Sequence, residues 1–218
     1  MMNFQFTERL PQDNSWSVYL FIGSFLLVAI VRAVFDKQFK DFLGLLYTNK
    51  YIKLYSETSL SWFSIVLTIV QLISYAFFIQ IMLSYFGFVH KTNVEVFIQI
   101  LAFISVFFGL KYAVKRSIAG LFNIQDFCNK YLFFEMSYKM YLGVLLLLGC
   151  FIMFYAKEPN AVLAYVILAV FLLLHLVVHL ISFRVFRKEI LSKMFYFILY
   201  LCTLEIAPYY FTYYWFTK

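Results

Sequence analysis

Three ionisable residues lie within two long apolar stretches of this chain, where they could form a proton-binding or ligand-binding site. His175 and His179 are four residues apart, so they share one face of a helix. Glu205 lies near the middle of the next stretch, and Pro208 follows it by one turn. The two stretches form a predicted hairpin, which places Glu205 and His175 at a similar depth. Each ionisable group needs a reason to be there, because it costs at least about 2.5–3.5 kcal/mol at the centre of a bilayer.

Two interpretations of this polar spot stay open, and we favour the second. In the first, Glu205 and His175 form a proton or ligand site, with Gln71, Gln80 or Gln99 nearby. In the second, Glu205 is protonated or paired, and it holds helices together. Hydrogen bonds between membrane helices contribute about 0.6 kcal/mol each on average.

A metal site is a weaker interpretation of the same residues. His175, His179 and Glu205 are ligand types that bind zinc, but the chain has no H-E-x-x-H motif. It also has no P-loop, no G-x-S-x-G, no G-x-G-x-x-G and no acidic cluster suited to Mg²⁺ and phosphates. We therefore predict no catalytic residues, no metal and no cofactor.

Six apolar stretches must position these residues. Hydrophobic residues make up 64% of the chain and charged residues 13%, against about 45–50% and about 25% in soluble domains. Stretches of this length are typical of helices that cross a bilayer. The predicted spans are residues 17–35, 61–86, 94–112, 140–156, 161–183 and 194–215.

The segments that join these spans alternate between basic and poorly charged. Most of the 18 Lys and Arg residues follow the first, third and fifth spans. The positive-inside rule puts these three segments in the cytoplasm and both termini on the other side. The net charge of +7 therefore indicates topology rather than nucleic-acid binding. The basic residues assigned to topology and lipid headgroups are Arg32, Lys37, Lys40, Lys115, Arg116, Arg184, Arg187 and Lys188.

Two of the basic segments are amphipathic. Residues 36–60 predict either a helix on the cytoplasmic surface or a loop packed on the bundle, and we weigh the two equally. Residues 113–139 predict an in-plane or cytoplasmic helix, which Gly120 is placed to break. The predicted fold is therefore an all-α polytopic membrane protein, a six-transmembrane-helix bundle of three hairpins with two cytoplasmic amphipathic segments. Residues 17–218 form one domain after a periplasmic tail, residues 1–16.

The sequence YLCTLEIAP, residues 200–208, resembles the C-terminal motif of a bacterial inner-membrane family known only as a domain of unknown function. Members of that family are similar to this chain in length, in number of spans, and in a final helix with Cys, Glu and Pro in this order. The resemblance implies a bacterial cytoplasmic membrane. It implies no activity, and it assigns no role to Glu205 or Pro208.

The absence of catalytic motifs and of soluble domains favours a non-enzymatic inner-membrane protein. We expect an accessory or structural subunit of a larger membrane complex. Its expected partners are the lipid bilayer, anionic lipid headgroups and one or more proteins, with no nucleic acid. The alternative is a proton-linked carrier of a small molecule or lipid, which uses Glu205 and His175. A third hypothesis is an intramembrane metalloenzyme that uses these two residues and His179.

Overall fold

The computed structural model describes residues 15–46, 50–55, 61–121, 125–155 and 161–185. All regular secondary structure in these ranges is helical, as predicted. Five helices are long: α1 (Ser15–Val34), α4 (Trp62–Tyr85), α5 (Val94–Leu121), α6 (Gln125–Tyr155) and α7 (Ala161–Val185). Three are short: α2 (Asp36–Leu43), the 3₁₀ helix η1 (Gly44–Leu46) and α3 (Lys50–Tyr55).

The five long helices are apolar and long enough to cross a membrane, which indicates a membrane protein. The candidate membrane spans are Ser15–Val34, Trp62–Tyr85, Val94–Ser117, Cys128–Tyr155 and Tyr165–Ser182. They overlap the first five predicted spans, although the third continues to Ser117 and the fourth begins at Cys128. The sixth prediction, residues 194–215, lies outside the described residues.

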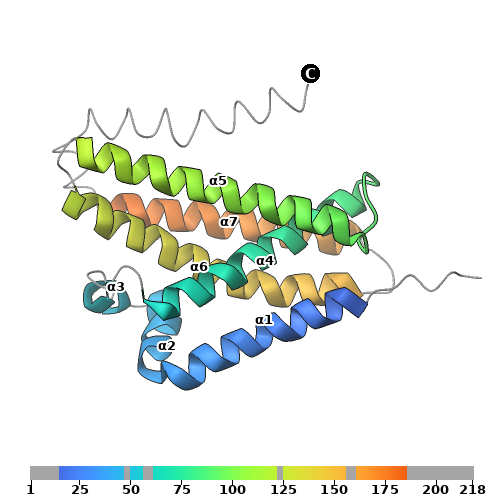
Figure 1. The fold of residues 1–218 in the computed structure, drawn as a ribbon, viewed down its shortest axis with the longest axis horizontal. Coiled ribbons are helices and arrows are strands. Elements are labelled where there is room, and N and C mark those ends of the chain that lie inside the picture. The colour runs from blue at the N-terminus through green and yellow to red at the C-terminus, as the bar shows by residue number, and fades with distance from the viewer. Residues whose placement is uncertain (1–14, 47–49, 56–60, 122–124, 156–160, 186–218) are drawn as a thin grey trace, which may run out of the picture.

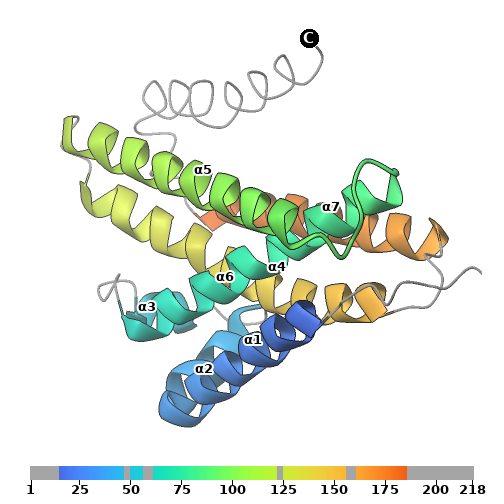
Figure 2. The same ribbon diagram turned by 45° about the vertical axis from the view of Figure 1, so that its right-hand side comes forward.

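Successive long helices run in opposite directions (Figure 1), with α4 packed against α1, α5 and α6. One end of the bundle therefore gathers the last residues of α1, α5 and α7 with the first residues of α4 and α6. We call it the basic end, because the segments rich in Lys and Arg meet there. At the opposite end, the hairpin end, residues 86–93 connect α4 to α5. Both views place α3 beside the start of α4, at the basic end (Figure 2).

Helices α4 and α6 approach each other closely at Gly143. A Cβ atom added to Gly143 would lie 2.8 Å from the Cα atom of Gln71, closer than real Cβ atoms come. One turn along α4, the carbonyl of Ser74 accepts a hydrogen bond from Cys150 Sγ at 3.7 Å. Small residues commonly allow this close approach between membrane helices. The crossing fixes the position of Gln71 on α4.

The first amphipathic segment packs on the bundle through its aromatic residues. Phe42, Leu45 and Tyr51 are buried, and the Tyr51 ring stacks on Phe133 of α6 at 5.7 Å between centroids. The Tyr138 hydroxyl donates to the Leu45 carbonyl at 3.1 Å. Burial raises the pKa of Tyr51 to about 12, so its phenol stays neutral. The segment is helical, as the first interpretation predicted, and it packs on the bundle, as the second predicted, so its apolar face is used within the chain.

The prediction of a separate helix over residues 113–139 is wrong. Helix α5 continues to Leu121 and α6 begins at Gln125, so the segment consists of the ends of two long helices. The reason is that Leu132 and Phe134 are buried, which continues the packed face of α6 beyond its purely apolar part. At 1.5 Å per residue, α5 and α6 are about 42 and 46 Å long, longer than the roughly 30 Å of hydrocarbon in a bilayer.

Candidate functional site

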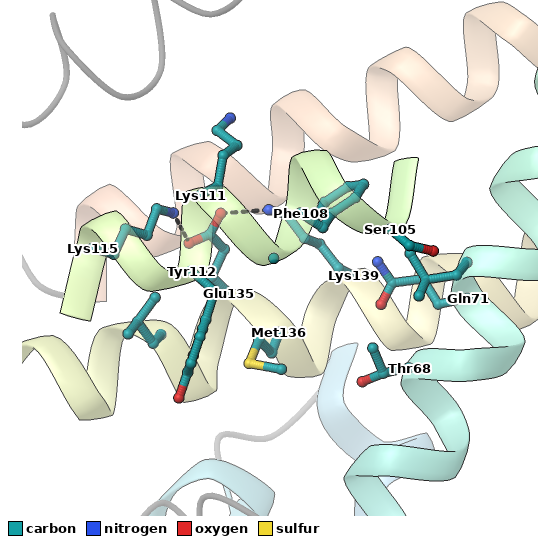
Figure 3. A pocket seen from close by; sticks show the side chains of 13 residues that line it. Thr68, Gln71, Ser105, Phe108, Lys111, Tyr112, Lys115, Glu135, Met136 and Lys139 are labelled. Carbon is teal, nitrogen blue, oxygen red and sulfur yellow. Dashed lines mark hydrogen bonds and ion pairs between the residues drawn. The ribbon is translucent and has the colours of Figure 1, made fainter. Parts of the chain in front are cut away.

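One carboxylate at the basic end holds two lysines. Glu135 of α6 accepts a hydrogen bond from Lys115 of α5 on one oxygen and from Lys139 of α6 on the other, each at 2.5 Å. Figure 3 shows the two lysine amines on either side of the carboxylate. Lys115 is 4% exposed and Glu135 8% exposed. We call these three residues the Lys115–Glu135–Lys139 triad.

The spacing of the triad along two antiparallel helices brings it together. Glu135 and Lys139 are four residues apart, so they share one face of α6. Lys111 and Lys115 have the same spacing on α5, and α5 joins α6 through a short connection at the basic end. Glu135 and Lys139 therefore meet Lys115 across the two helices. The Lys111 amine instead points away from the carboxylate (Figure 3) and lies 5.3 Å from the centre of the Phe107 ring on its own helix.

The electrostatics of the triad combine burial with an uneven charge. Two ammonium groups meet one carboxylate, so the triad carries a formal charge of +1. Each ammonium has three N–H donors and gives one of them to Glu135. The Lys139 ammonium also lies 5.3 Å from the centre of the Phe108 ring, within cation–π distance. Buried charges of this kind need close geometry to offset their desolvation.

A cavity of about 280 Å³ opens beside the triad, between α4, α5 and α6. Gln71 of α4 lines it on the side away from Lys115, as Figure 3 shows. Two further polar residues there are satisfied locally, because Thr68 and Ser105 donate to carbonyls of their own helices. The volume of the cavity is close to the lower end of the roughly 300–1,000 Å³ range of ligand pockets. The remaining lining residues are Leu72, Phe108, Gly109, Lys111, Tyr112, Leu132 and Met136.

The triad lies where the uncharged part of the bundle ends. In α6, residues 140–155 carry no charge, which is about 24 Å of helix at 1.5 Å per residue. In α5, the uncharged residues 96–110 span about 23 Å. Lys111 and Lys139 follow directly at the end of these segments, and Lys115 and Glu135 lie one turn further out. The triad is therefore at the depth where hydrocarbon gives way to headgroups.

Comparison with known proteins places the chain in a family. Residues 17–216 match the family described as Domain of unknown function (DUF4271). The chain belongs to this family. The DUF4271 match covers the triad, the cavity and nearly all of the described residues. No curated protein and no solved structure matches the chain.

Lys115 is placed differently from the prediction for this DUF4271 chain. Its sequence context predicts a basic residue that faces lipid headgroups, but its side chain is buried between α5 and α6. The physical reason is Glu135, which supplies the opposite charge inside the bundle. Of the predicted polar residues that the structure describes, Gln71 lines the same cavity.

The predicted histidine site is only partly described. The ring of His175 is half-buried on α7, 4.4 Å from the Phe171 centroid and 6.3 Å from that of Tyr75. His179 lies in the same helix, whereas Glu205 and Pro208 lie outside the described residues. The pairing of Glu205 with His175 stays a prediction.

The other two predicted glutamines, and the predicted surface cations apart from Lys115, do not line this cavity where the structure describes them. Gln99 is exposed on α5, and Gln80 donates to the Asn93 carbonyl at the hairpin end, at 2.8 Å. Arg187 and Lys188 lie outside the described residues. The other basic residues assigned to topology are exposed: Arg32, Lys37, Lys40, Arg116 and Arg184.

Sequence reasoning missed Glu135 and Lys139. Both fell in residues 113–139, which were interpreted as an amphipathic surface segment. The available signal was their i,i+4 spacing, matched by Lys111 and Lys115 on the preceding span. Within the described part of the chain, no group of three His, Cys, Asp or Glu residues is placed to hold a metal ion.

Proposed function

We propose that this DUF4271 protein is a non-enzymatic membrane carrier that binds an anionic group in the cavity between α4, α5 and α6. The observation that supports this proposal is the convergence of Lys115 and Lys139 on one carboxylate beside a cavity, within an otherwise apolar bundle. Ionisable side chains inside membrane segments are costly, and they commonly mark ligand or ion sites.

This proposal retains the carrier function of the alternative hypothesis, without its proton coupling, and assigns ligand binding to different residues. The predicted Glu205 and His175 pair is replaced by Lys115, Glu135 and Lys139 as the binding group. Glu135 lies between two cations, which gives it a positioning role. The lysines are the groups that meet the ligand.

We further propose that the basic end faces the cytoplasm and that the protein resides in a bacterial inner membrane, with both termini periplasmic. The charge distribution supports this orientation through the positive-inside rule. A reporter fused to the C-terminus is expected to be active only in the periplasm. Activity only in the cytoplasm would exclude the orientation.

Blocking the cavity tests the binding function without touching a charge. A Cβ atom on Gly109, which lines the cavity, meets no atom within 4 Å, and the same holds for Gly23 on α1. Gly109→Leu should fill the cavity, and Gly23→Leu is its matched control. The measurement is thermal unfolding of the purified protein in neutral detergent, with inorganic phosphate, glycerol 3-phosphate or phosphatidylglycerol added.

At least one of these probes should stabilise the natural protein and Gly23→Leu, and none should stabilise Gly109→Leu. A ligand at 100 times its Kd stabilises by about 2.7 kcal/mol. The proposal fails if no probe stabilises the natural protein, or if Gly109→Leu responds as the control does.

The accessory-subunit function remains the second candidate. It is supported by the outer helices: 11% of the α5 span and 6% of the α7 span is buried, against 61% of the α4 span. These surfaces are available to lipid or to another protein. Affinity capture in mild detergent should return a stoichiometric partner if the chain is a subunit, and a lone protein would argue against it.

A further inference from the structure

The cavity beside the triad is charged at one side and apolar over most of its wall, with the uncharged polar residues Gln71, Thr68 and Ser105 away from Lys115 (Figure 3). Lys115 and Lys139 meet Glu135 at the charged side. Phe108, Met136 and several neighbours form the apolar wall. A small soluble anion needs only the lysines, whereas an amphiphile contacts both the lysines and the apolar wall.

The depth of the triad matches the position of lipid phosphates. The uncharged parts of α5 and α6 are about 23 and 24 Å long, and the triad follows within one turn. A phospholipid carries its phosphate just outside the hydrocarbon, at this same level. Ammonium groups and phosphate oxygens form short, charge-assisted hydrogen bonds.

The size of the cavity fits part of a lipid. About 280 Å³ has room for a phosphate, the glycerol and the first methylenes, but not for two acyl chains. Helix α5, which forms one wall, exposes Phe103, Val106 and Leu110 by about 60% each. The acyl chains can therefore follow the apolar surface of the protein in the surrounding bilayer.

We propose that the anionic group bound at the triad is the phosphate of a membrane phospholipid. The phosphate binds Lys115 and Lys139, and the glycerol end of the acyl chains packs on Phe108 and Met136. This inference rests on the proposed function and names its ligand class. A free phosphate is the other source of the same chemistry, and the experiment separates the two.

The experiment compares a cavity lysine with a matched surface lysine. Lys139 pairs with Glu135 at i,i+4, and Lys40 pairs in the same way with Asp36 on α2, at 2.6 Å, with Lys40 72% exposed. Lys139→Gln and Lys40→Gln therefore remove the same charge from the same end of the molecule. Binding is measured by native mass spectrometry of protein in neutral detergent, with phosphatidylglycerol, phosphatidylcholine or inorganic phosphate added.

Phosphatidylglycerol should bind the natural protein at least about tenfold more tightly than inorganic phosphate does. Lys139→Gln should weaken the binding of phosphatidylglycerol about tenfold relative to the natural protein, which corresponds to one lost charged contact of about 1.4 kcal/mol. Lys40→Gln should leave it unchanged, and Lys139→Arg should retain most of it. Lys139→Gln keeps the Lys115–Glu135 pair, so a folded protein is expected.

Other outcomes separate this inference from the proposed function. Binding of inorganic phosphate without selective lipid binding overturns the inference and leaves the anion site standing. Equal losses in Lys139→Gln and Lys40→Gln overturn it as well, because they show attraction to surface charge alone. Binding of none of the three probes overturns the inference, and it overturns the proposed function as well if glycerol 3-phosphate also fails to stabilise the natural protein.

Discussion

The two ends of the bundle use their polar side chains in opposite ways. At the hairpin end, Trp16, Gln80 and Lys91 each donate to a backbone carbonyl oxygen, at 2.8–2.9 Å. At the basic end, Lys115 binds the side chain of Glu135, and a cavity lies beside the pair. The hairpin end is closed by groups that satisfy the backbone, whereas the basic end concentrates charge beside an open space.

This difference separates polar residues that the fold needs, because they satisfy backbone carbonyls, from polar residues that it does not need. A carbonyl at the end of a helix requires a donor in any case, so the bond from Lys91 to Phe154, in the last turn of α6, serves the fold itself. The bond from Trp16 fixes the connection before α5, where Thr92 lies. A buried carboxylate with two lysines serves no such need. Apolar residues of similar volume often replace a buried ion pair without loss, or even with a gain, in stability. The triad is therefore the better candidate for function.

Glu135→Ala should break this comparison most strongly. It leaves Lys115 buried without its carboxylate, and removal of one partner from a buried ion pair costs about 3–5 kcal/mol. The matched control is Asp36→Ala, which breaks the exposed Asp36–Lys40 pair, where a loss below about 1 kcal/mol is expected. Thermal or denaturant unfolding in detergent measures both, and equal losses would show that the triad is not buried.

Gly143→Ala should cost about 1–3 kcal/mol, because its methyl group would overpack the α4–α6 crossing at Gln71. Gly109→Ala is the control, since its methyl group meets no atom within 4 Å. There the better helix propensity of alanine should leave stability unchanged or raise it by up to about 1 kcal/mol. The same unfolding measurement applies. A harmless Gly143→Ala would mean that the two helices lie further apart than described.

Trp16→Phe should cost about 0.5–1.5 kcal/mol, the net contribution of one hydrogen bond. The indole Nε1 donates to the Thr92 carbonyl at 2.9 Å, and phenylalanine keeps most of the ring packing while it removes this donor. Phospholipid binding at the other end should not change. A variant that retains its stability but loses lipid would place a binding function at the hairpin end and reverse the comparison.

The combined variant Lys115→Met, Glu135→Leu and Lys139→Met should have the smallest effect on stability and the largest on binding. No buried charge is left unpaired, so the unfolding free energy should change by less than about 1 kcal/mol or increase. Binding of phosphatidylglycerol should be lost. A large loss of stability would instead assign the triad a structural role.

Much of the fold follows from the sequence, because apolar length alone defines the spans. Five predicted spans overlap the long helices. The three basic segments follow alternate spans, and the structure brings them together at the basic end. The predicted helix boundaries are wrong beyond the uncharged segments of α5 and α6. A span predicted to stop at Tyr112 continues to Leu121, since helices α5 and α6 support each other beyond the hydrocarbon.

The candidate site was less predictable, because it depends on tertiary contacts. Gln71 was identified from its polarity within a span. Lys115 was identified as a cation but assigned to the surface, since nothing local to it shows that Glu135 lies opposite. Contacts between residues that are distant along the chain, rather than local pattern, decide which lysine is buried.

An experimental structure of the protein in nanodiscs that contain phosphatidylglycerol tests the central claim most directly. We expect density for a phosphate within hydrogen-bond distance of Lys115 and Lys139, with acyl density beside Phe108. A cavity that is empty, or that is filled by neighbouring side chains with lipid only outside the bundle, would contradict it.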